Sequence, residues 1–325
     1  MTGRRVRAAL LVILLVLCGS AVTAAALIEV AEARIANRPP LRLGLMTPGG
    51  PTASDELDAA AAALGEHPSI LMWYEDFAQP PPIASLQATA ARGATPLITW
   101  EPWAWGEGVD QPRFASDRIV AGDHDGMIAA WGQALAEWGE PVLLRYGHEM
   151  NGPWYPWTDG VNGNRRGDYV AAWRHVHDLV EGAGATNVRW VWSPSVPTDD
   201  MPPMETLYPG SSYVDVVALD GYNWGTSSSW TSWEEPAELF GKPLETLRSV
   251  APGKPILIAE TASAEVGGDK AAWIRTLIPY LSSQLDVEAV VWFNADKEVD
   301  WRFDSSTESE AALREALAAR RPAAD

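Results

Sequence analysis

Short apolar runs alternate along the chain with segments whose apolar residues recur at helical spacing. The runs are five or six residues long, are bounded by turn residues and have the composition of buried strands. They cover residues 41–46, 69–73, 95–100, 141–146, 188–192, 214–219, 255–259 and 289–293. Helices are predicted between and after them at 54–64, 83–92, 125–138, 167–182, 233–250, 269–285 and 308–320.

This alternation predicts an α/β fold with a parallel sheet. Eight such strands in a stretch of roughly 250 residues favour a closed (β/α)8 TIM barrel over an open doubly wound sheet. No Gly-x-Gly-x-x-Gly motif follows the first strand, which further disfavours a dinucleotide-binding fold. Barrel enzymes carry their chemistry at the carboxyl ends of the strands, so the residues that follow the apolar runs are the ones to examine.

The first residues have the features of a targeting segment. Arg4, Arg5 and Arg7 precede an uncharged run at 8–28, and small residues fill 19–26. This order favours a cleaved secretory signal peptide. An uncleaved membrane anchor is the alternative, because the run is as long as a bilayer-spanning helix of ~20 residues. We expect 1–28 to be the signal or anchor, 29–40 a linker, and 41–325 a single domain that is secreted or tethered to the outer face of the cell membrane through 8–28.

Composition limits how the domain is stabilised and what it binds. The only cysteine, Cys18, lies in the targeting segment, so the hydrophobic core rather than a disulfide must stabilise the domain. The net charge of −19 disfavours nucleic acid and anionic lipid as partners, whereas a neutral polymer is compatible with it. We expect a monomer that contacts a membrane only where the targeting segment is retained.

Two glutamates follow buried strands. Glu149 comes after the fourth apolar run and Glu260 directly after the seventh. A buried carboxylate without partners is costly, and Arg145 and His148 are placed to compensate one or both. Two carboxyl groups at one end of a barrel suit glycoside hydrolysis, in which one protonates the leaving oxygen and the other attacks or stabilises the anomeric carbon. A structural ion pair at the barrel rim is the alternative for either one, and four other acidic residues also follow strands: Glu75, Asp76, Glu101 and Asp220.

The chain contains 17 tryptophans, and their positions divide them into two groups. Trp131 and Trp138 lie seven residues apart in a helical pattern, which predicts a role in the core. Many others follow strands, where flat rings would form a groove suited to the apolar faces of pyranose rings. The aromatic residues of this second group are Trp73, Tyr74, Trp100, Trp103, Trp105, Trp154, Tyr155, Trp157, Tyr222, Trp224 and Trp292.

Metal and serine chemistry are poorly supported. His148-Glu149 lacks the second histidine of an HExxH zinc site. His175 and His177 are two apart in a helical pattern and face different directions. No GxSxG elbow is present. We expect no metal and no cofactor.

The sequence around the two glutamates resembles glycoside hydrolase family 26, the retaining endo-β-mannanases and mixed-linkage β-glucanases built on (β/α)8 barrels. The resemblance extends over about 41–306 and is most specific in His148-Glu149-Met150-Asn151-Gly152, followed by Trp154. It implies that Glu149 is the acid/base, Glu260 the nucleophile and Tyr222 a hydrogen-bond donor to that nucleophile. It also implies that Trp292 stacks on a sugar and that Trp154 lines the cleavage subsite.

Substrate choice stays open among mannan, mixed-linkage β-glucan and xylan. Trp154-Tyr155-Pro156-Trp157 replaces the WFWW-like run of the mannanases, and together with Ile98-Thr99-Trp100-Glu101-Pro102-Trp103 it is closer to the β-glucanase branch. We expect Glu149 and Glu260 to be catalytic, with His148, Tyr222 and Arg145 in support. The expected substrate-binding residues are Trp154, Trp157, Trp100, Trp103, Trp224 and Trp292.

The expected activity is retaining endo-hydrolysis of a β-1,4-linked or mixed β-1,3/1,4-linked polysaccharide by double displacement. A cell-surface glycan-binding protein with the same groove and little or no catalysis is the main alternative, and a sugar-modifying transferase is another. The presence of both glutamates with His148 and Tyr222 favours the enzyme.

Overall fold

The computed structural model describes residues 39–320. The expected signal or anchor at 1–28 lies outside these residues, as does the linker at 29–40 apart from its two final prolines. Within 39–320, none of the helices combines the length and the apolar character needed to cross a bilayer.

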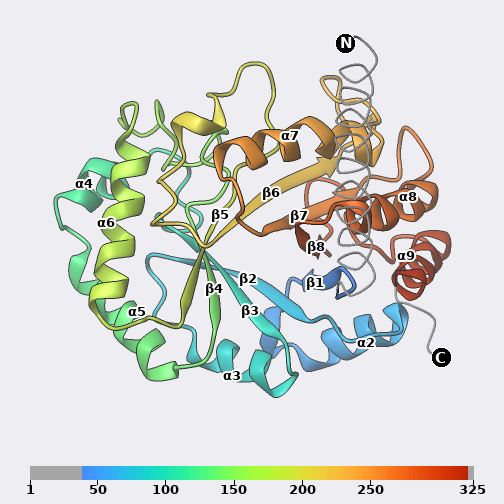
Figure 1. Cartoon of the computed structure of the whole chain (residues 1–325), viewed down its shortest axis with the longest axis horizontal. Helices are drawn as coiled ribbons and strands as arrows, with labels where there is room; N and C mark the ends of the chain where they lie inside the picture. The colour runs from blue at the N-terminus through green and yellow to red at the C-terminus, as the bar shows by residue number, and fades with distance from the viewer. Residues whose placement is uncertain (1–38, 321–325) are drawn as a thin grey trace, which may run out of the picture. The chain divides into compact units, whose positions relative to one another are not determined.

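In the described part of the chain eight parallel strands close into a barrel, in which each strand pairs with the next and the last pairs with the first (Figure 1). The prediction of a (β/α)8 barrel is therefore confirmed. The strands are β1 (Arg42–Met46), β2 (Ile70–Asp76), β3 (Thr95–Glu101), β4 (Val142–Tyr146), β5 (Val188–Trp192), β6 (Val216–Asn223), β7 (Ile256–Ser263) and β8 (Val287–Phe293).

Helices surround the barrel and cover the outer face of the strands (Figure 1). They are α2 (Ser54–Leu64), α3 (Ile83–Ala91), α4 (Ser116–Val120), α5 (Asp125–Trp138), α6 (Asp168–Gly182), α7 (Pro236–Val250), α8 (Lys270–Ser283) and α9 (Thr307–Ala319). The short α4 has no counterpart among the predicted helices. Helix α7 begins three residues later than predicted, because Glu235 and Glu238 form a reciprocal capping box around the proline that starts the helix.

Three strands extend by three or more residues beyond their apolar runs at the carboxyl end. Strands β2, β6 and β7 continue the ladder through polar residues, so Tyr222 and Glu260 lie inside strands rather than in the loops after them. The apolar pattern ends earlier because these side chains carry polar groups into the barrel mouth. The backbones of Tyr222 and Glu260 are therefore fixed by the hydrogen bonds of the sheet.

Alternation along each strand separates the barrel interior from the strand–helix layer. On β3, Thr99 faces the interior and binds Arg145, whereas the neighbouring Trp100 points outward. The ring of Trp100 stacks on Trp131 of α5, with 4.5 Å between ring centroids. The same parity governs which residues of each strand reach the barrel mouth.

Charged contacts join the two ends of the barrel domain. The guanidinium of Arg320, which follows α9, donates to the carbonyl of Leu41 at 2.6 Å. It also pairs with Glu66, which follows α2, at 2.5 and 3.1 Å. The side chains of Arg320 and Glu66 and the residue Leu41 are all shielded from solvent. These contacts therefore hold the last helix against the first strand and helix.

Helices α5 and α6 approach closely at Gly132. A Cβ placed on this glycine would lie 2.8 Å from the Cβ of Ala183 and 3.0 Å from the backbone of Val180. The missing side chain therefore sets the distance between the two helices. Gly126 lies on the same helix and has open space around it.

Replacing this glycine tests the packing of the outer layer. Gly132→Ala is expected to lower the free energy of unfolding by about 1–3 kcal/mol, because the backbone of α6 cannot yield without a shift. Denaturant unfolding followed by fluorescence measures the change. The control Gly126→Ala should leave stability unchanged or raise it by up to ~1 kcal/mol; equal losses in both variants would contradict the close approach.

Candidate active site

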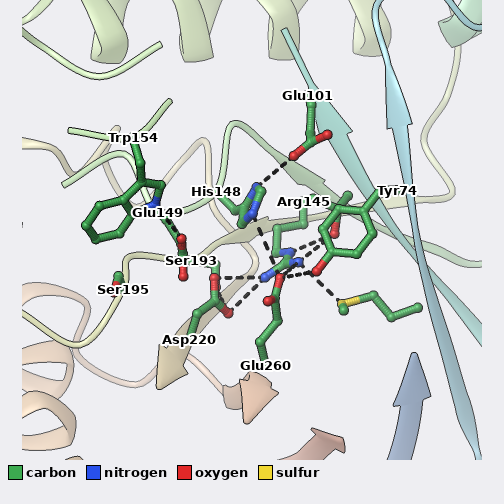
Figure 2. Close-up of polar contacts among 12 residues, drawn as sticks. Tyr74, Glu101, Arg145, His148, Glu149, Trp154, Ser193, Ser195, Asp220 and Glu260 are labelled. Atoms are coloured by element: carbon green, nitrogen blue, oxygen red, sulfur yellow. Dashed lines mark hydrogen bonds and ion pairs between the residues drawn. The ribbon is translucent and has the colours of Figure 1, made fainter. Parts of the chain in front are cut away.

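A fully buried arginine lies at the centre of the barrel mouth (Figure 2). Arg145, on β4, donates through Nη1 to both carboxylate oxygens of Asp220 at 2.8 and 2.9 Å. Its Nε and Nη2 reach the hydroxyl of Thr99 at 2.9 and 2.6 Å, and Nη2 also donates to Glu260 Oε1. The guanidinium thus joins strands β3, β4, β6 and β7.

The charges of this cluster stabilise one another. Burial opposes the charge of Arg145, but Asp220 and Glu260 outweigh it and raise the pKa of the guanidinium above its usual range. Burial raises the pKa of Asp220, and the charge of Arg145 acts against that shift. Ser193 adds a hydrogen bond to Asp220 at 2.9 Å. Paired in this geometry, the guanidinium keeps its charge in the core.

Glu260, on β7, accepts from two tyrosines in addition to Arg145. The hydroxyl of Tyr74 lies 2.6 Å from Oε1 and the hydroxyl of Tyr222 lies 2.5 Å from Oε2. Burial, followed by the charge of Glu260, raises the pKa of both tyrosines, so they remain neutral donors. Three donors on one carboxylate fix its orientation.

The sheet is irregular where it carries this carboxylate. The ladder between β6 and β7 shifts register between Leu219 and Asp220, and the ladder between β7 and β8 shifts between Ile258 and Thr261. Irregularities of this kind re-aim side chains and are frequent beside active sites. Here they lie next to Glu260.

Tyr74 is a site residue that the sequence analysis did not single out from the other aromatic residues. It lies on β2 two positions after Met72, whose sulfur contacts Arg145 at 3.3 Å. Because alternate residues of a strand share a face, Met72 and Tyr74 both point into the barrel. The contact between Met72 and Arg145 fixes this parity, so the sequence of β2 alone does not identify Tyr74.

Glu149 lies in the loop after β4, in a left-handed backbone conformation with φ of 50°. Gly147 has the same φ, and together they turn the chain back towards the barrel mouth. The backbone N–H of Glu149 donates to the carbonyl of Ser193 at 2.7 Å. A non-glycine residue in this region costs about 1–3 kcal/mol, and such residues cluster at functional sites.

The carboxyl group of Glu149 is poised to hold a proton. Burial, then the negative charge of Glu260, raises its pKa to about 8. The indole N–H of Trp154 donates to Oε2 at 2.7 Å, and this bond, with the charge of Arg145, acts in the opposite direction. At neutral pH Glu149 is therefore mainly protonated.

The approach of Trp154 to Glu149 depends on Gly152. A Cβ on Gly152 would lie only 2.1 Å from the indole ring of Trp154. The glycine in this loop thus leaves room for the ring to fold back over the backbone and donate to the carboxyl group.

His148 separates two carboxyl groups (Figure 2). Its Nδ1 lies 3.9 Å from Glu101 Oε1 and its Nε2 lies 3.9 Å from Glu260 Oε1, both too long for hydrogen bonds. Burial, then the charge of Arg145, lowers the pKa of His148 well below its usual range. The ring is a neutral spacer between Glu101 and Glu260.

Glu101, at the end of β3, is a third buried carboxyl group in the mouth. The indole N–H groups of Trp103 and Trp105 both donate to Oε2, at 3.0 and 2.6 Å. Burial raises the pKa of Glu101 to about 7, and the two indoles act against the shift. By its pKa alone, Glu101 is an alternative acid. It faces His148, however, whereas the charge of Glu260 is the second-largest cause of the raised pKa of Glu149.

The comparisons with known sequences bear on this constellation. The sequence model of glycosyl hydrolase family 26 matches residues 107–273, just over half of the 325 residues. The chain belongs to glycosyl hydrolase family 26. The resemblance noted from the motif around Glu149 is thereby confirmed.

Relatives in family 26 cover different shares of the chain. Endoglucanase H of Acetivibrio thermocellus is 41% identical over 254 residues, which make up 76% of this chain and 27% of that protein. The mannan endo-1,4-beta-mannosidase of Bacillus subtilis strain 168 is 34% identical over 95 residues, 28% of this chain and 25% of that protein. The aligned part thus spans about a quarter of the length of each of these relatives.

The fold is shared with solved family 26 structures. The catalytic domain of the endo-beta-1,4-mannanase of Bacillus sp. JAMB-750 superposes with a TM-score of 0.64 and 18% identity, over 86% of each chain. At this identity the likeness concerns the barrel architecture alone.

In this family 26 domain the predicted site residues fall into two groups. Arg145, His148, Glu149, Tyr222 and Glu260 converge on the barrel mouth, as expected. The six tryptophans expected to bind substrate do not share one environment. Trp154 is 41% exposed, and Trp103 and Trp224 are partly exposed, whereas Trp100, Trp157 and Trp292 are buried.

Strand parity explains why Trp292 does not face the mouth. It is the neighbouring Phe293 whose ring meets Tyr74 and Tyr222, at centroid distances of 6.5 and 5.8 Å. Trp292 therefore points outward, where it approaches Trp273 of α8 and is almost fully buried. The prediction that Trp292 stacks on a sugar is not compatible with this placement, and the same argument applies to Trp100 on β3.

Trp157 is buried for a different reason. Its ring stacks on Tyr155, with 4.3 Å between centroids and 12° between planes, and its N–H donates to the carbonyl of His148 at 2.7 Å. It holds the loop that carries Glu149 and is not available as a sugar platform.

The indole bond to Glu149 is open to a direct test. Trp154→Phe should raise the pKa of Glu149 above its value of about 8, because the lost N–H stabilises the carboxylate. Carboxyl-detected NMR titration measures the change. The matched variant Trp105→Phe should raise the pKa of Glu101 and leave the pKa of Glu149 unchanged. An unshifted Glu149 in Trp154→Phe would contradict the bond.

Proposed function

We propose that the domain is a retaining endo-β-glycanase that hydrolyses a β-1,4-linked or mixed β-1,3/1,4-linked polysaccharide. The observation that carries this proposal is the contrast between two carboxyl groups at one barrel mouth. Glu260 accepts hydrogen bonds from Tyr74, Tyr222 and Arg145, and Glu149 has a pKa raised to about 8. One nucleophile and one acid are the requirements of double displacement.

In the first step Glu260 attacks the anomeric carbon and the bond from that carbon to the glycosidic oxygen breaks. Glu149 gives its proton to the departing oxygen, so the leaving chain is released as an alcohol. Tyr74, Tyr222 and Arg145 orient the attacking carboxylate. This leaves a glycosyl ester on Glu260 and an ionised Glu149.

In the second step the roles of Glu149 reverse. Esterified Glu260 carries no charge, so its repulsion no longer adds to burial in raising the pKa of Glu149. The hydrogen bond from Trp154 stabilises the carboxylate that results. Glu149 then takes a proton from water while the water oxygen attacks the anomeric carbon, and the sugar leaves with its configuration retained.

One consideration favours a β-glucan over mannan as the substrate, and a second favours neutral polymers in general. The relative aligned over most of this chain is named endoglucanase H, whereas the mannosidase of Bacillus subtilis aligns over 28% of it. The chain carries a net charge of −19, which is compatible with a neutral polymer and disfavours acidic ones. We therefore place mixed-linkage β-glucan before mannan.

A panel of polymers tests the function. The purified protein is incubated with lichenan, mannan, β-1,3-glucan and xylan, and new reducing ends are measured. We expect release from lichenan, loss of release in Glu260→Gln with the fold intact, and the β-anomer as the first product seen by proton NMR. No release from any polymer, or an α-anomer formed first, would refute the proposal.

Tyr74 offers a test of how the nucleophile is held. Tyr74→Phe removes one hydrogen bond to a charged group, so kcat should fall about 10- to 100-fold. Steady-state kinetics on the best polymer of the panel measures this. Tyr280→Phe is the matched control, because Tyr280 lies on α8 and has no contact with Glu260; its kcat should not change. An unchanged kcat in Tyr74→Phe would remove Tyr74 from the site.

A further inference from the structure

The loop after β6 carries three tryptophans that the reaction does not use, and two of them, Trp224 and Trp230, lie side by side. Trp224 is half-buried, and Trp230 is 74% exposed, the highest value among the large apolar side chains of the described residues. Their ring centroids lie 5.6 Å apart. A single exposed tryptophan needs no explanation, but this one adjoins a second ring that leads to the active site.

Aromatic contacts connect this pair to the nucleophile. Tyr222, which donates to Glu260, lies 6.5 Å from Trp224 between ring centroids. Trp301 fills the space behind both, at 4.9 Å from Tyr222 and 4.8 Å from Trp224. Tyr222, Trp224 and Trp230 therefore form a row of rings that begins at the catalytic carboxylate and becomes more exposed along its length.

The base of the loop is fixed by one side chain. The Asn223 amide oxygen accepts from the backbone N–H groups of Gly225 at 3.3 Å and Glu234 at 3.1 Å, which lie at opposite ends of the loop. Its amide N–H donates to Ser263 on β7 at 3.0 Å. These bonds join both ends of the loop to the barrel.

The tip of the loop is also ordered. Thr231 and Ser228 exchange two hydrogen bonds, at 3.2 and 3.1 Å, so the turn that carries Trp230 closes on itself. Gly225 has a φ of 53°, and a Cβ there would lie 1.8 Å from the carbonyl of Val266. The loop thus rests directly on the segment after β7. A ring held in this way loses little entropy on binding.

The composition of the loop identifies what it would bind. Residues 224–233 read WGTSSSWTSW and contain no charge, in a chain whose net charge is −19. Small hydroxyl side chains leave the indole faces open and offer donors and acceptors beside them. Flat apolar faces next to neutral hydroxyl groups match a pyranose ring, which combines a C–H face with equatorial hydroxyls.

We propose that Trp230, with Trp224, forms a distal subsite that binds a sugar ring of the polysaccharide beyond the cleavage point. This inference rests on the proposed function for the identity of the polymer. It adds that the loop after β6 recognises that polymer. The occupant is a neutral β-linked glycan chain that runs from the mouth along the row of rings.

A comparison of long and short substrates tests the subsite. Trp230→Ala should raise KM for lichenan about 3- to 10-fold with little change in kcat, the range typical of a lost ring contact. The short substrate 4-nitrophenyl β-cellobioside should be affected much less. Leu285→Ala, which removes another exposed apolar side chain from the connection between α8 and β8, is the control and should alter neither.

Binding in the Glu260→Gln background separates this inference from the proposed function. Affinity electrophoresis through lichenan should retard Glu260→Gln, and the added Trp230→Ala should reduce the retardation. Retardation that depends on Trp230 in a protein that hydrolyses nothing would refute the function and support the subsite. Equal retardation and equal KM with and without Trp230 would overturn the subsite, as would absence of any retardation. A wild-type dimer that Trp230→Ala dissociates, with KM unchanged, would also overturn it.

Discussion

The site depends on one buried cation shared by two carboxylates. Arg145 has no exposed surface, and a guanidinium in that position is stable only when its charge is matched. Asp220 takes two of its N–H groups and Glu260 another. Burial of Glu149, and then the negative charge of Glu260, raise the pKa of Glu149. The contacts of the barrel interior thus place the two carboxyl groups in different environments.

Much of this arrangement follows from the sequence, because parallel strands bring their carboxyl ends together. Once the apolar runs indicated a barrel, Glu149 and Glu260 were expected at one mouth, and Arg145 was expected to compensate at least one of them. The division of labour within that charge cluster was not predictable. Asp220 was one of several acidic residues after strands, and Tyr74 one of many aromatics, and only the three-dimensional contacts single them out.

The errors concern the direction of side chains. Trp100 and Trp292 were expected in a groove because they lie near the carboxyl ends of strands, but position along a strand does not give the face. The face follows from the alternation of side chains along the strand. Thr99 binds the buried arginine, so the next residue, Trp100, points outward. Phe293 lies at the mouth, so the preceding residue, Trp292, points outward as well. The contact between the Arg145 guanidinium and Thr99 joins residues far apart in the sequence. The face on which each residue of β3 lies could therefore not be fixed from the sequence of β3 alone.

The loop after β4 positions Glu149 through several residues that lie close together in the sequence. Glu149 sits in a left-handed conformation, and Gly152 admits the Trp154 ring that binds its carboxyl group. Asn151 exchanges two hydrogen bonds of 2.9 Å with the backbone of the next loop and fixes the turn. Each of these residues acts on the acid. Pro156, where the motif departs from the mannanases, instead binds within the loop through its carbonyl at 2.7 Å. The departure therefore concerns the internal packing of the loop rather than the hydrogen bond made to Glu149.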